Sequence, residues 1–243
     1  MNRIIHFVLS RRGLSVVLLA ALLALPSGAG AEGQSCRPAR GSTGQFDYYL
    51  LSLSWSPAFC ATPAGAKHPD QCGTAAPARG FVVHGLWPQY LPGSAAATAQ
   101  GGGALWPQCC GGAEPFRPDA VPPQLDGVMI GTDLRRHEWS KHGTCATPRS
   151  GEYFAKIVAA VGTVGTASDL RPTAPSKIRV GELKQHFPVP SQAIFPTCKG
   201  KTLSEVRVCL DRSLAPIPCP DSARRSDNCP GTVILPVGPE AQP

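Results

Sequence analysis

The 243-residue chain has few charged residues and no long apolar run. Only 16% of its residues are charged, whereas glycine and proline contribute 26 residues each. This composition excludes a coiled coil or a long helical bundle and indicates abundant loops. The main apolar stretch, residues 14–25, is shorter than the roughly 20 residues that a helix needs to cross a bilayer. We see neither an internal repeat nor a dividing linker and expect one compact domain.

The N-terminal residues have the pattern of an export signal. Arginines at positions 3, 11 and 12 precede the apolar stretch, which is followed by Pro26 and by the small residues 29–31. We therefore expect residues 1–31 to be a cleaved signal peptide and residues 32–243 to form the domain. Removing three arginines lowers the formal net charge from +7 to +4. The remaining positive charge still favours the attraction of polyanions. We expect a secreted or periplasmic monomer without a membrane anchor.

Ten cysteines lie downstream of this segment, and their number is even. None of them forms the C-x2-C pair that four-ligand zinc sites normally use. Because an exported chain meets an oxidising environment, five disulfide bonds are the better prediction, and we expect no metal. The cysteines are at positions 36, 60, 72, 109, 110, 145, 198, 209, 219 and 229.

Hydrophobic patterns predict strands early and late in the chain, with helices between them. The expected strands cover residues 46–55, 81–84, 203–210 and 232–237. The expected helices cover residues 132–142, 153–161 and 178–187. Gly85 is expected to end the second strand, Thr132 or Asp133 to cap the first helix, and Gly143 to stop it. Strands on both sides of central helices indicate an α+β fold.

Titratable residues gather in two short segments, residues 81–89 and 137–145. At about 100° of rotation per helical residue, Glu138, Lys141 and His142 fall on one face of a helix. His137 lies at the margin of this face and extends it. A solvated helix surface seldom carries a carboxylate, an ammonium and two imidazoles on one face, so these residues are candidates for a functional site. His84, at the end of the strand in the first segment, is the further candidate.

Three other site types fit the sequence poorly. The zinc motif H-E-x-x-H needs its second histidine at position 141, which is Lys141. A phosphate loop ending at residues 200–202 would need a glycine where Phe195 stands. The G-x-S-x-G elbow of serine hydrolases is absent. Metalloprotease, nucleotide triphosphate and serine hydrolase chemistry are therefore disfavoured.

Two histidines with a lysine and a carboxylate suit cleavage of an RNA phosphodiester. RNA carries its own nucleophile, the 2′-hydroxyl, so the enzyme needs only a base for that proton and an acid for the departing 5′-oxygen. With an unperturbed pKa of about 6.5, one histidine can be neutral while another is protonated. A cation such as Lys141 would stabilise the charge that accumulates on the phosphate.

The segments His84–Pro88 (HGLWP) and His137–Cys145 (HEWSKHGTC) resemble the two active-site segments of the ribonuclease T2 family. Similarity extends over roughly residues 45 to 235. The resemblance implies an α+β fold with a central antiparallel sheet that brings the two segments together. It also implies cleavage of single-stranded RNA with low base specificity, leaving 2′,3′-cyclic phosphate ends, without a cofactor.

The resemblance also implies residue roles. His142 resembles the general base and His84 the general acid, while Glu138 and Lys141 resemble the pair that stabilises the phosphorane. His137 resembles an auxiliary phosphate-binding histidine. Among the remaining candidates, Trp87 stands where the family stacks a base. Gln89 stands where many members have an acidic residue or asparagine, which leaves the base preference open.

Disulfide pairs follow from the same resemblance. It implies the pairs Cys60–Cys72, Cys110–Cys145, Cys198–Cys229 and Cys209–Cys219, which leaves Cys36 with Cys109. A noncatalytic secreted binding or signalling protein on the same scaffold is the alternative function. A substitution at His84, Lys141 or His142 would indicate that alternative, and all three residues are present.

Overall fold

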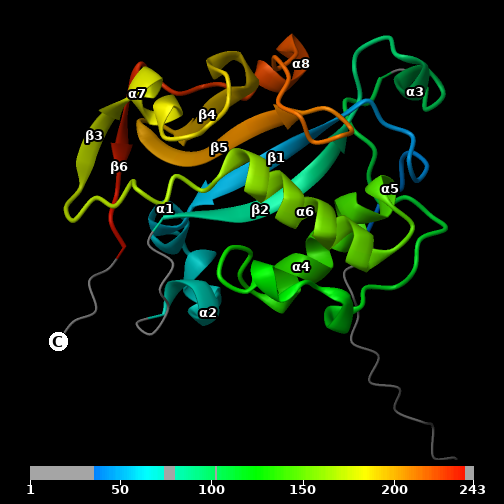
Figure 1. Ribbon diagram of the computed structural model, residues 1–243, viewed down its shortest axis with the longest axis horizontal. Coiled ribbons are helices and arrows are strands. Elements are labelled where there is room, and N and C mark those ends of the chain that lie inside the picture. The colour runs from blue at the N-terminus through cyan, green and yellow to red at the C-terminus, as the bar shows by residue number, and fades with distance from the viewer. Residues whose placement is uncertain (1–35, 74–79, 102, 239–243) are drawn as a thin grey trace, which may run out of the picture. The chain divides into compact units, whose positions relative to one another are not determined.

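The computed structural model describes residues 36–73, 80–101 and 103–238 (Figure 1). The expected signal peptide, residues 1–31, lies outside the described residues. The strands are β1 (Tyr48–Trp55), β2 (Phe81–Gln89), β3 (Ser176–Arg179), β4 (Ile194–Lys199), β5 (Thr202–Leu210) and β6 (Thr232–Leu235). The α-helices are α1 (Ser56–Cys60), α2 (Pro69–Cys72), α3 (Ala95–Thr98), α4 (Thr132–Glu138), α5 (Thr144–Ala146), α6 (Ser150–Val164), α7 (Val180–Gln185) and α8 (Asp221–Arg224). Short 3₁₀ helices are η1 (Gly65–Lys67), η2 (Pro118–Ala120), η3 (Pro123–Leu125) and η5 (Ser191–Ala193), and η4 (Trp139–Gly143) is a π-helical turn.

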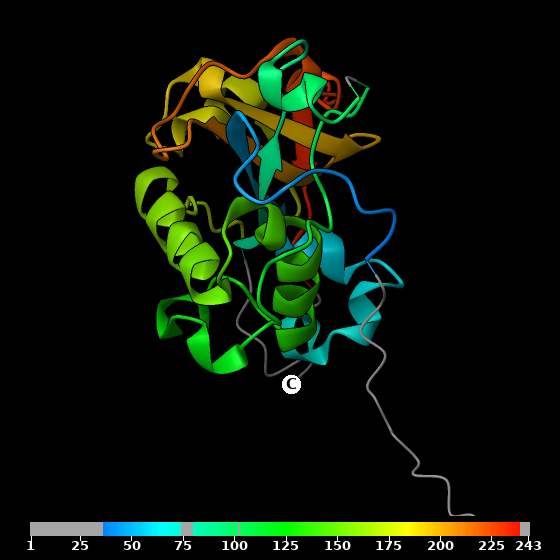
Figure 2. The ribbon, with the colours of Figure 1, turned by 90° about the vertical axis from the view of Figure 1, so that its right-hand side faces the viewer.

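Six strands form one sheet with the order β2-β1-β5-β6-β3, and β4 pairs with β5. All pairings are antiparallel except the short contact between β5 and β6, which is parallel. In Figures 1 and 2, α6 and the α4 segment lie together on one side of β1, β2 and β5. The predicted α+β class is therefore confirmed.

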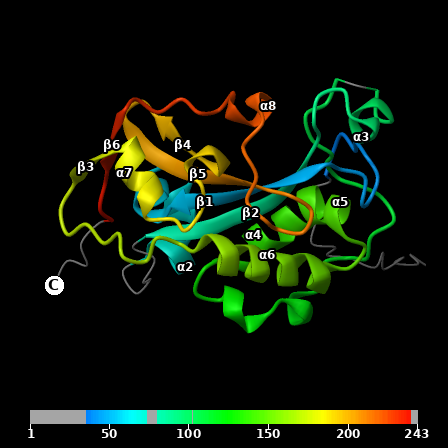
Figure 3. The same ribbon diagram turned by 45° about the horizontal axis from the view of Figure 1, so that its top comes forward.

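Strand β1 is buried on both faces, which explains its continuous apolar sequence. Tyr49, Leu51 and Leu53 point into the main core, together with Trp139 from η4 and residues of α6. Tyr48 and Leu50 point into a smaller core on the other face. Figure 3 shows β1 between β2 and β5, at the centre of the strands that carry the site.

Strand β2 does not end at Gly85 as predicted but continues to Gln89. Its pairing with β1 passes from Ser52↔Gly85 to Leu53↔Val83, so His84 is the extra residue of a β-bulge. A bulge bends its strand and changes the direction of a side chain, and bulges are common beside functional sites. Val83 and Leu86 consequently both reach the core, while His84 points away from it.

The first predicted helix differs from expectation at both ends. Its N-cap is Gly131, without a side-chain cap, and Thr132 is already helical. Gly143 has a φ of −61° and does not stop the helix, which continues through η4 into α5. Gly143 is needed for another reason, because a Cβ there would collide with the rings of Trp139 and Tyr153.

Two further elements show how sheet pairing overrides local patterns. The predicted helix over residues 178–187 is shortened to α7, because Ile178 belongs to β3 and pairs with Val233. Strand β4 was not predicted. It contains Pro196, which cannot donate a backbone hydrogen bond. A proline is tolerated there because β4 pairs only with β5 and its other edge is free.

Five disulfide bonds connect the loops to the sheet and helices. Four of them are the pairs that the resemblance implies, Cys60–Cys72, Cys110–Cys145, Cys198–Cys229 and Cys209–Cys219, and the fifth is the remaining pair, Cys36–Cys109. The bond from Cys145 in α5 to Cys110 fixes the end of the helical segment that carries Lys141 and His142. Within the described ranges, no helix has the length and apolar character needed to cross a membrane.

Candidate active site

A pocket of about 450 Å³ lies against β2, the α4–η4 segment and β5. Every residue that the sequence predicts for catalysis or substrate contact lines it: His84, Trp87, Gln89, His137, Glu138, Lys141 and His142. The bulged strand supplies the first three of these side chains, and the helical segment supplies the other four. Two segments about fifty residues apart are thus brought to one place, as expected.

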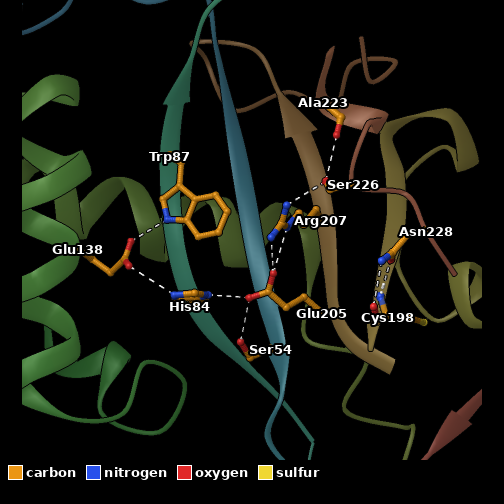
Figure 4. Close-up of polar contacts among 10 residues, drawn as sticks. All are labelled: Ser54, His84, Trp87, Glu138, Cys198, Glu205, Arg207, Ala223, Ser226 and Asn228. Atoms are coloured by element: carbon orange, nitrogen blue, oxygen red, sulfur yellow. Dashed lines mark hydrogen bonds and ion pairs between the residues drawn. The ribbon is translucent and has the colours of Figure 1, made fainter. Parts of the chain in front are cut away.

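His84 faces a carboxylate on each side (Figure 4). Its Nδ1 lies 2.6 Å from Glu205 Oε1, and its Nε2 lies 3.6 Å from Glu138 Oε1. Burial alone would lower the pKa of His84, but the hydrogen bond to Glu205 and the charges of both carboxylates outweigh it and raise that pKa. This imidazole therefore holds its proton more strongly than an isolated histidine does, which suits a proton donor.

Glu138 is buried at the back of the pocket, with only 1% of its surface exposed. Its Oε2 accepts a hydrogen bond of 2.7 Å from Trp87 Nε1. Burial raises the pKa of Glu138 to about 7, although His84, the Trp87 hydrogen bond and Lys141 act in the opposite direction. The carboxyl group is consequently partly protonated near neutral pH and can donate as well as accept a hydrogen bond.

His142, on η4, is also buried, and its ring centroid lies 5.4 Å from that of Trp87. Burial lowers the pKa of His142 to about 2, with further contributions from Lys141, His137 and His84. The imidazole is therefore neutral at physiological pH, and one of its two ring nitrogens carries no proton. The pKa of His84 moves in the opposite direction, so His84 holds a proton more strongly than His142 does, the difference that acid–base catalysis uses.

His137 and Lys141 provide further nitrogen donors at the same pocket. Burial and the neighbouring Lys141 lower the pKa of His137. The backbone of Lys141 is held in place, because its carbonyl accepts a 2.8 Å hydrogen bond from the Cys109 amide. An ammonium and an imidazole are thus placed at the same pocket as His84 and His142.

Gln89 is only 7% exposed, and its Nε2 donates a 2.9 Å hydrogen bond to the carbonyl of Pro88. Trp87 is in contact with His142, with His84 and with the guanidinium of Arg207, which lies 5.2 Å from its ring centroid. Both residues line the pocket.

The raised pKa of Glu138 predicts a pH-dependent stability. A glutamate in the unfolded chain titrates at about 4.3, whereas Glu138 in the folded chain titrates at about 7. Its contribution to stability is therefore fully present below the unfolded pKa and is lost as the pH rises through 7. Glu138→Gln does not ionise, so the free energy of unfolding should fall less between about pH 4 and about pH 8, by about 1–3 kcal/mol. Urea denaturation at a series of pH values measures this difference, and parallel curves for the two proteins would contradict it.

Sequence reasoning missed Glu205 and Arg207 of β5, which contact His84 and Trp87. Both charged residues alternate with the buried Val206 and Val208. Because successive side chains of a strand point to opposite faces, the sequence predicts that Glu205 and Arg207 face away from the main core. The strand neighbours of β5 could not be read from the sequence. Trp106 of the same pocket was missed as well. For Arg225, the sequence leaves open whether its charge is merely solvated or attracts RNA, and the structure places it in the pocket lining.

In the part of the chain that the structure describes, no cluster of three or more histidine, cysteine, aspartate or glutamate side chains is arranged to hold a metal ion. All ten cysteines are in disulfide bonds and do not titrate.

The chain is similar in sequence to several ribonucleases. It is 40% identical to a ribonuclease of Aeromonas hydrophila over 131 residues, which are 54% of this chain and 49% of that protein. It is 38% identical to a probable ribonuclease of Haemophilus influenzae over 118 residues, 45% of this chain and 40% of that protein. The chain therefore spans about half the length of these relatives or less. Ribonuclease DdI of Dictyostelium discoideum is 27% identical over 217 residues, 79% of this chain and 86% of that protein.

Solved structures with the same fold include trichomaglin, described as a novel S-like ribonuclease, and an RNase-related protein from Calystegia sepium. Trichomaglin has a TM-score of 0.58 at 22% identity and covers 80% of this chain and 100% of its own. The Calystegia protein has a TM-score of 0.56 at 23% identity, and the match covers 79% of this chain and 98% of the Calystegia protein. The model of the ribonuclease T2 family matches residues 46–219, which include both segments that line the pocket. The chain therefore belongs to the ribonuclease T2 family.

Proposed function

We propose that the chain is an exported endoribonuclease that cleaves single-stranded RNA by transphosphorylation and leaves 2′,3′-cyclic phosphate ends. The observation that carries this proposal is that His84, His142, Lys141 and Glu138 line one pocket. The pKa values of the two histidines, which move in opposite directions, support it. A neutral and a protonated imidazole are the two groups that this reaction needs. Because RNA supplies the nucleophile, the reaction needs no cofactor.

In this mechanism His142 accepts the proton of the 2′-hydroxyl while the oxygen attacks phosphorus. His84 donates its Nε2 proton to the departing 5′-oxygen, which completes formation of the cyclic phosphate. The ammonium of Lys141 neutralises charge on the nonbridging oxygens. Glu138, being partly protonated near neutral pH, donates a hydrogen bond to the same oxygens.

Substrate contacts are assigned to the remaining residues of the pocket. His137 contacts a phosphate, and Trp87 with Gln89 contacts a base, since stacking on an aromatic ring accepts any base. Export after removal of residues 1–31 is supported by the five disulfide bonds, which persist in oxidising compartments.

The test compares single-stranded RNA with DNA of the same sequence, each with and without EDTA. We expect the exported form to cleave RNA at the same rate with and without chelator, to leave DNA intact because it lacks the 2′-hydroxyl, and to give a bell-shaped pH profile. Phosphorus NMR of the first products should show a cyclic phosphate. Inhibition by EDTA that zinc reverses would contradict metal-independent cleavage, and RNA binding without cleavage would favour the noncatalytic alternative.

A further inference from the structure

The side chain of Glu205, on β5, contacts residues of the two neighbouring strands β1 and β2 (Figure 4). It lies on β5, and its Oε1 reaches across β1 to Nδ1 of His84 on β2 at 2.6 Å. The same oxygen accepts a 3.3 Å hydrogen bond from Ser54 Oγ of β1. The contact therefore depends on the strand order β2-β1-β5 rather than on any local segment.

The carboxylate of Glu205 is held from behind by Arg207. The Nε and Nη2 atoms of Arg207 donate to Oε2 of Glu205 at 3.0 and 2.7 Å, and Nη1 donates to Ser226 Oγ at 2.9 Å. Burial alone would raise the pKa of Glu205, but the hydrogen bond and charge of His84, together with Arg207, lower it to about 2. The group is thus a fixed anion over the whole working range of pH.

A fixed anion at Nδ1 determines which nitrogen of His84 exchanges protons. Nδ1 keeps its hydrogen toward Glu205 in both protonation states, because an ionised carboxylate can only accept. Nε2, on the opposite edge of the ring, faces Glu138 and the pocket. The proton that leaves the ring is therefore the one that points toward the site of cleavage.

We propose that Glu205 is the positioning residue for His84, holding the ring so that its Nε2 proton faces the departing oxygen and keeping the ring charged until that proton is transferred. This inference rests on the proposed function, because it assigns Glu205 to the same reaction. Arg207 and Ser54 do not contact the ring in this role; they hold the carboxylate of Glu205 in place through hydrogen bonds. An Asp–His pair in serine proteases orients its imidazole by the same physical means.

Several charged groups face His84, and each affects its titration. Glu205 and Arg207 face it from β5, and Glu138 with Lys141, His137 and His142 faces it from the α4–η4 segment. Replacing Glu205 with glutamine removes the negative charge and leaves Arg207 uncompensated. Both changes disfavour the protonated ring, so the pKa of His84 should fall.

The variant Glu205→Gln keeps the size of the side chain and tests the charge. We expect the alkaline limb of the kcat/KM profile to move to lower pH. Activity should fall by about tenfold or more near pH 7.5 and by less near pH 5, since a general acid contributes about 10²- to 10⁴-fold in total. KM should change little. Glu182→Gln is the matched control, because Glu182 pairs with Arg179 on the surface away from the pocket, and its profile should coincide with that of the unchanged protein.

A second measurement does not need RNA cleavage. Heteronuclear NMR of the histidine ring nitrogens gives the pKa and the tautomer of His84 in the unchanged protein and in Glu205→Gln. We expect the Nδ1–H tautomer in the neutral ring of the unchanged protein, and a lower pKa in the variant. An unchanged pKa, or a neutral ring that carries its proton on Nε2, would overturn the assignment even in an active enzyme.

The two measurements separate this inference from the proposed function. If RNA is not cleaved but His84 titrates as expected, the proposed function fails and the reaction assigned to Glu205 fails with it, while the ring geometry stands. If RNA is cleaved and the profile of Glu205→Gln does not move, only the assignment of Glu205 fails. If the variant does not fold, the tautomer of the unchanged protein still decides.

Discussion

Replacing His142 with alanine is expected to reduce kcat/KM for single-stranded RNA by about 10²- to 10⁴-fold, the contribution of a general base. The structure gives the reason. His142 is buried, its pKa is lowered to about 2, and it is therefore the neutral imidazole of the pocket. The other imidazole beside Lys141, that of His137, also has a lowered pKa, but it is assigned to a phosphate contact and not to the 2′-hydroxyl. Initial rates of cleavage at a fixed pH, with substrate below KM, measure the change.

A matched control for this variant is His186→Ala. His186 pairs with Asp169 at 2.7 Å outside the pocket, so its removal should leave cleavage within about twofold and stability nearly unchanged, as for exposed ion pairs generally. Thermal denaturation of both variants separates loss of catalysis from loss of fold. Full activity of a folded His142→Ala protein would refute the role assigned to His142.

Gly85→Ala is expected to reduce activity by about 10- to 100-fold although no catalytic side chain is removed. A Cβ at position 85 would overlap Oε2 of Glu138 and press against Nε1 of Trp87. These atoms share the 2.7 Å hydrogen bond that holds the carboxyl group in place. Displacing a catalytic group by about 1 Å can cost about 10²-fold in rate, and overpacking costs about 1–3 kcal/mol of stability.

Kinetics and urea denaturation of Gly85→Ala measure both effects. Gly162→Ala is the control, since Gly162 lies on the exposed side of α6 with open space around its Cβ position. In that helical setting alanine should stabilise the chain by about 0.5–1 kcal/mol and leave cleavage unchanged. If Gly85→Ala matched the unchanged protein in both measurements, the close packing of Gly85 against Glu138 would not matter for function.

Much of the fold was predictable because its elements are locally encoded. Strands β1 and β5 and helix α6 have apolar patterns of the correct period, and the structure confirms them with somewhat different ends. The errors that concern the sheet share one cause. The sequence predicts a helix at Ile178, but Ile178 pairs with Val233 in the sheet. Pro196 disfavours a strand in the sequence, yet it lies within β4. Gly85 adjoins a bulge and does not end β2. Pairing with a partner strand decided each of these positions, and a local pattern carries no information about the partner strand.

The candidate site was predictable to a similar degree. Segments 81–89 and 137–145 resemble the two active-site segments of the ribonuclease T2 family, and this resemblance, not their spacing, led us to expect them in one pocket. Glu205 could not be found in the same way, because it is 121 residues from His84 in sequence. The π-helical form of residues 139–143 was also not predictable from the helical pattern, since α and π turns differ by one residue in their hydrogen bonds.

By itself the sequence determined which groups are available for chemistry, how many cysteines can pair, and the α+β class, because each of these depends on residue type and local spacing. The tertiary structure alone decided how those groups titrate. Burial and neighbouring charges move the pKa of Glu138 to about 7, that of His142 to about 2, and that of His84 upward. Such shifts arise from the surroundings of a group in three dimensions, and the strand order β2-β1-β5 supplies the decisive neighbour, Glu205.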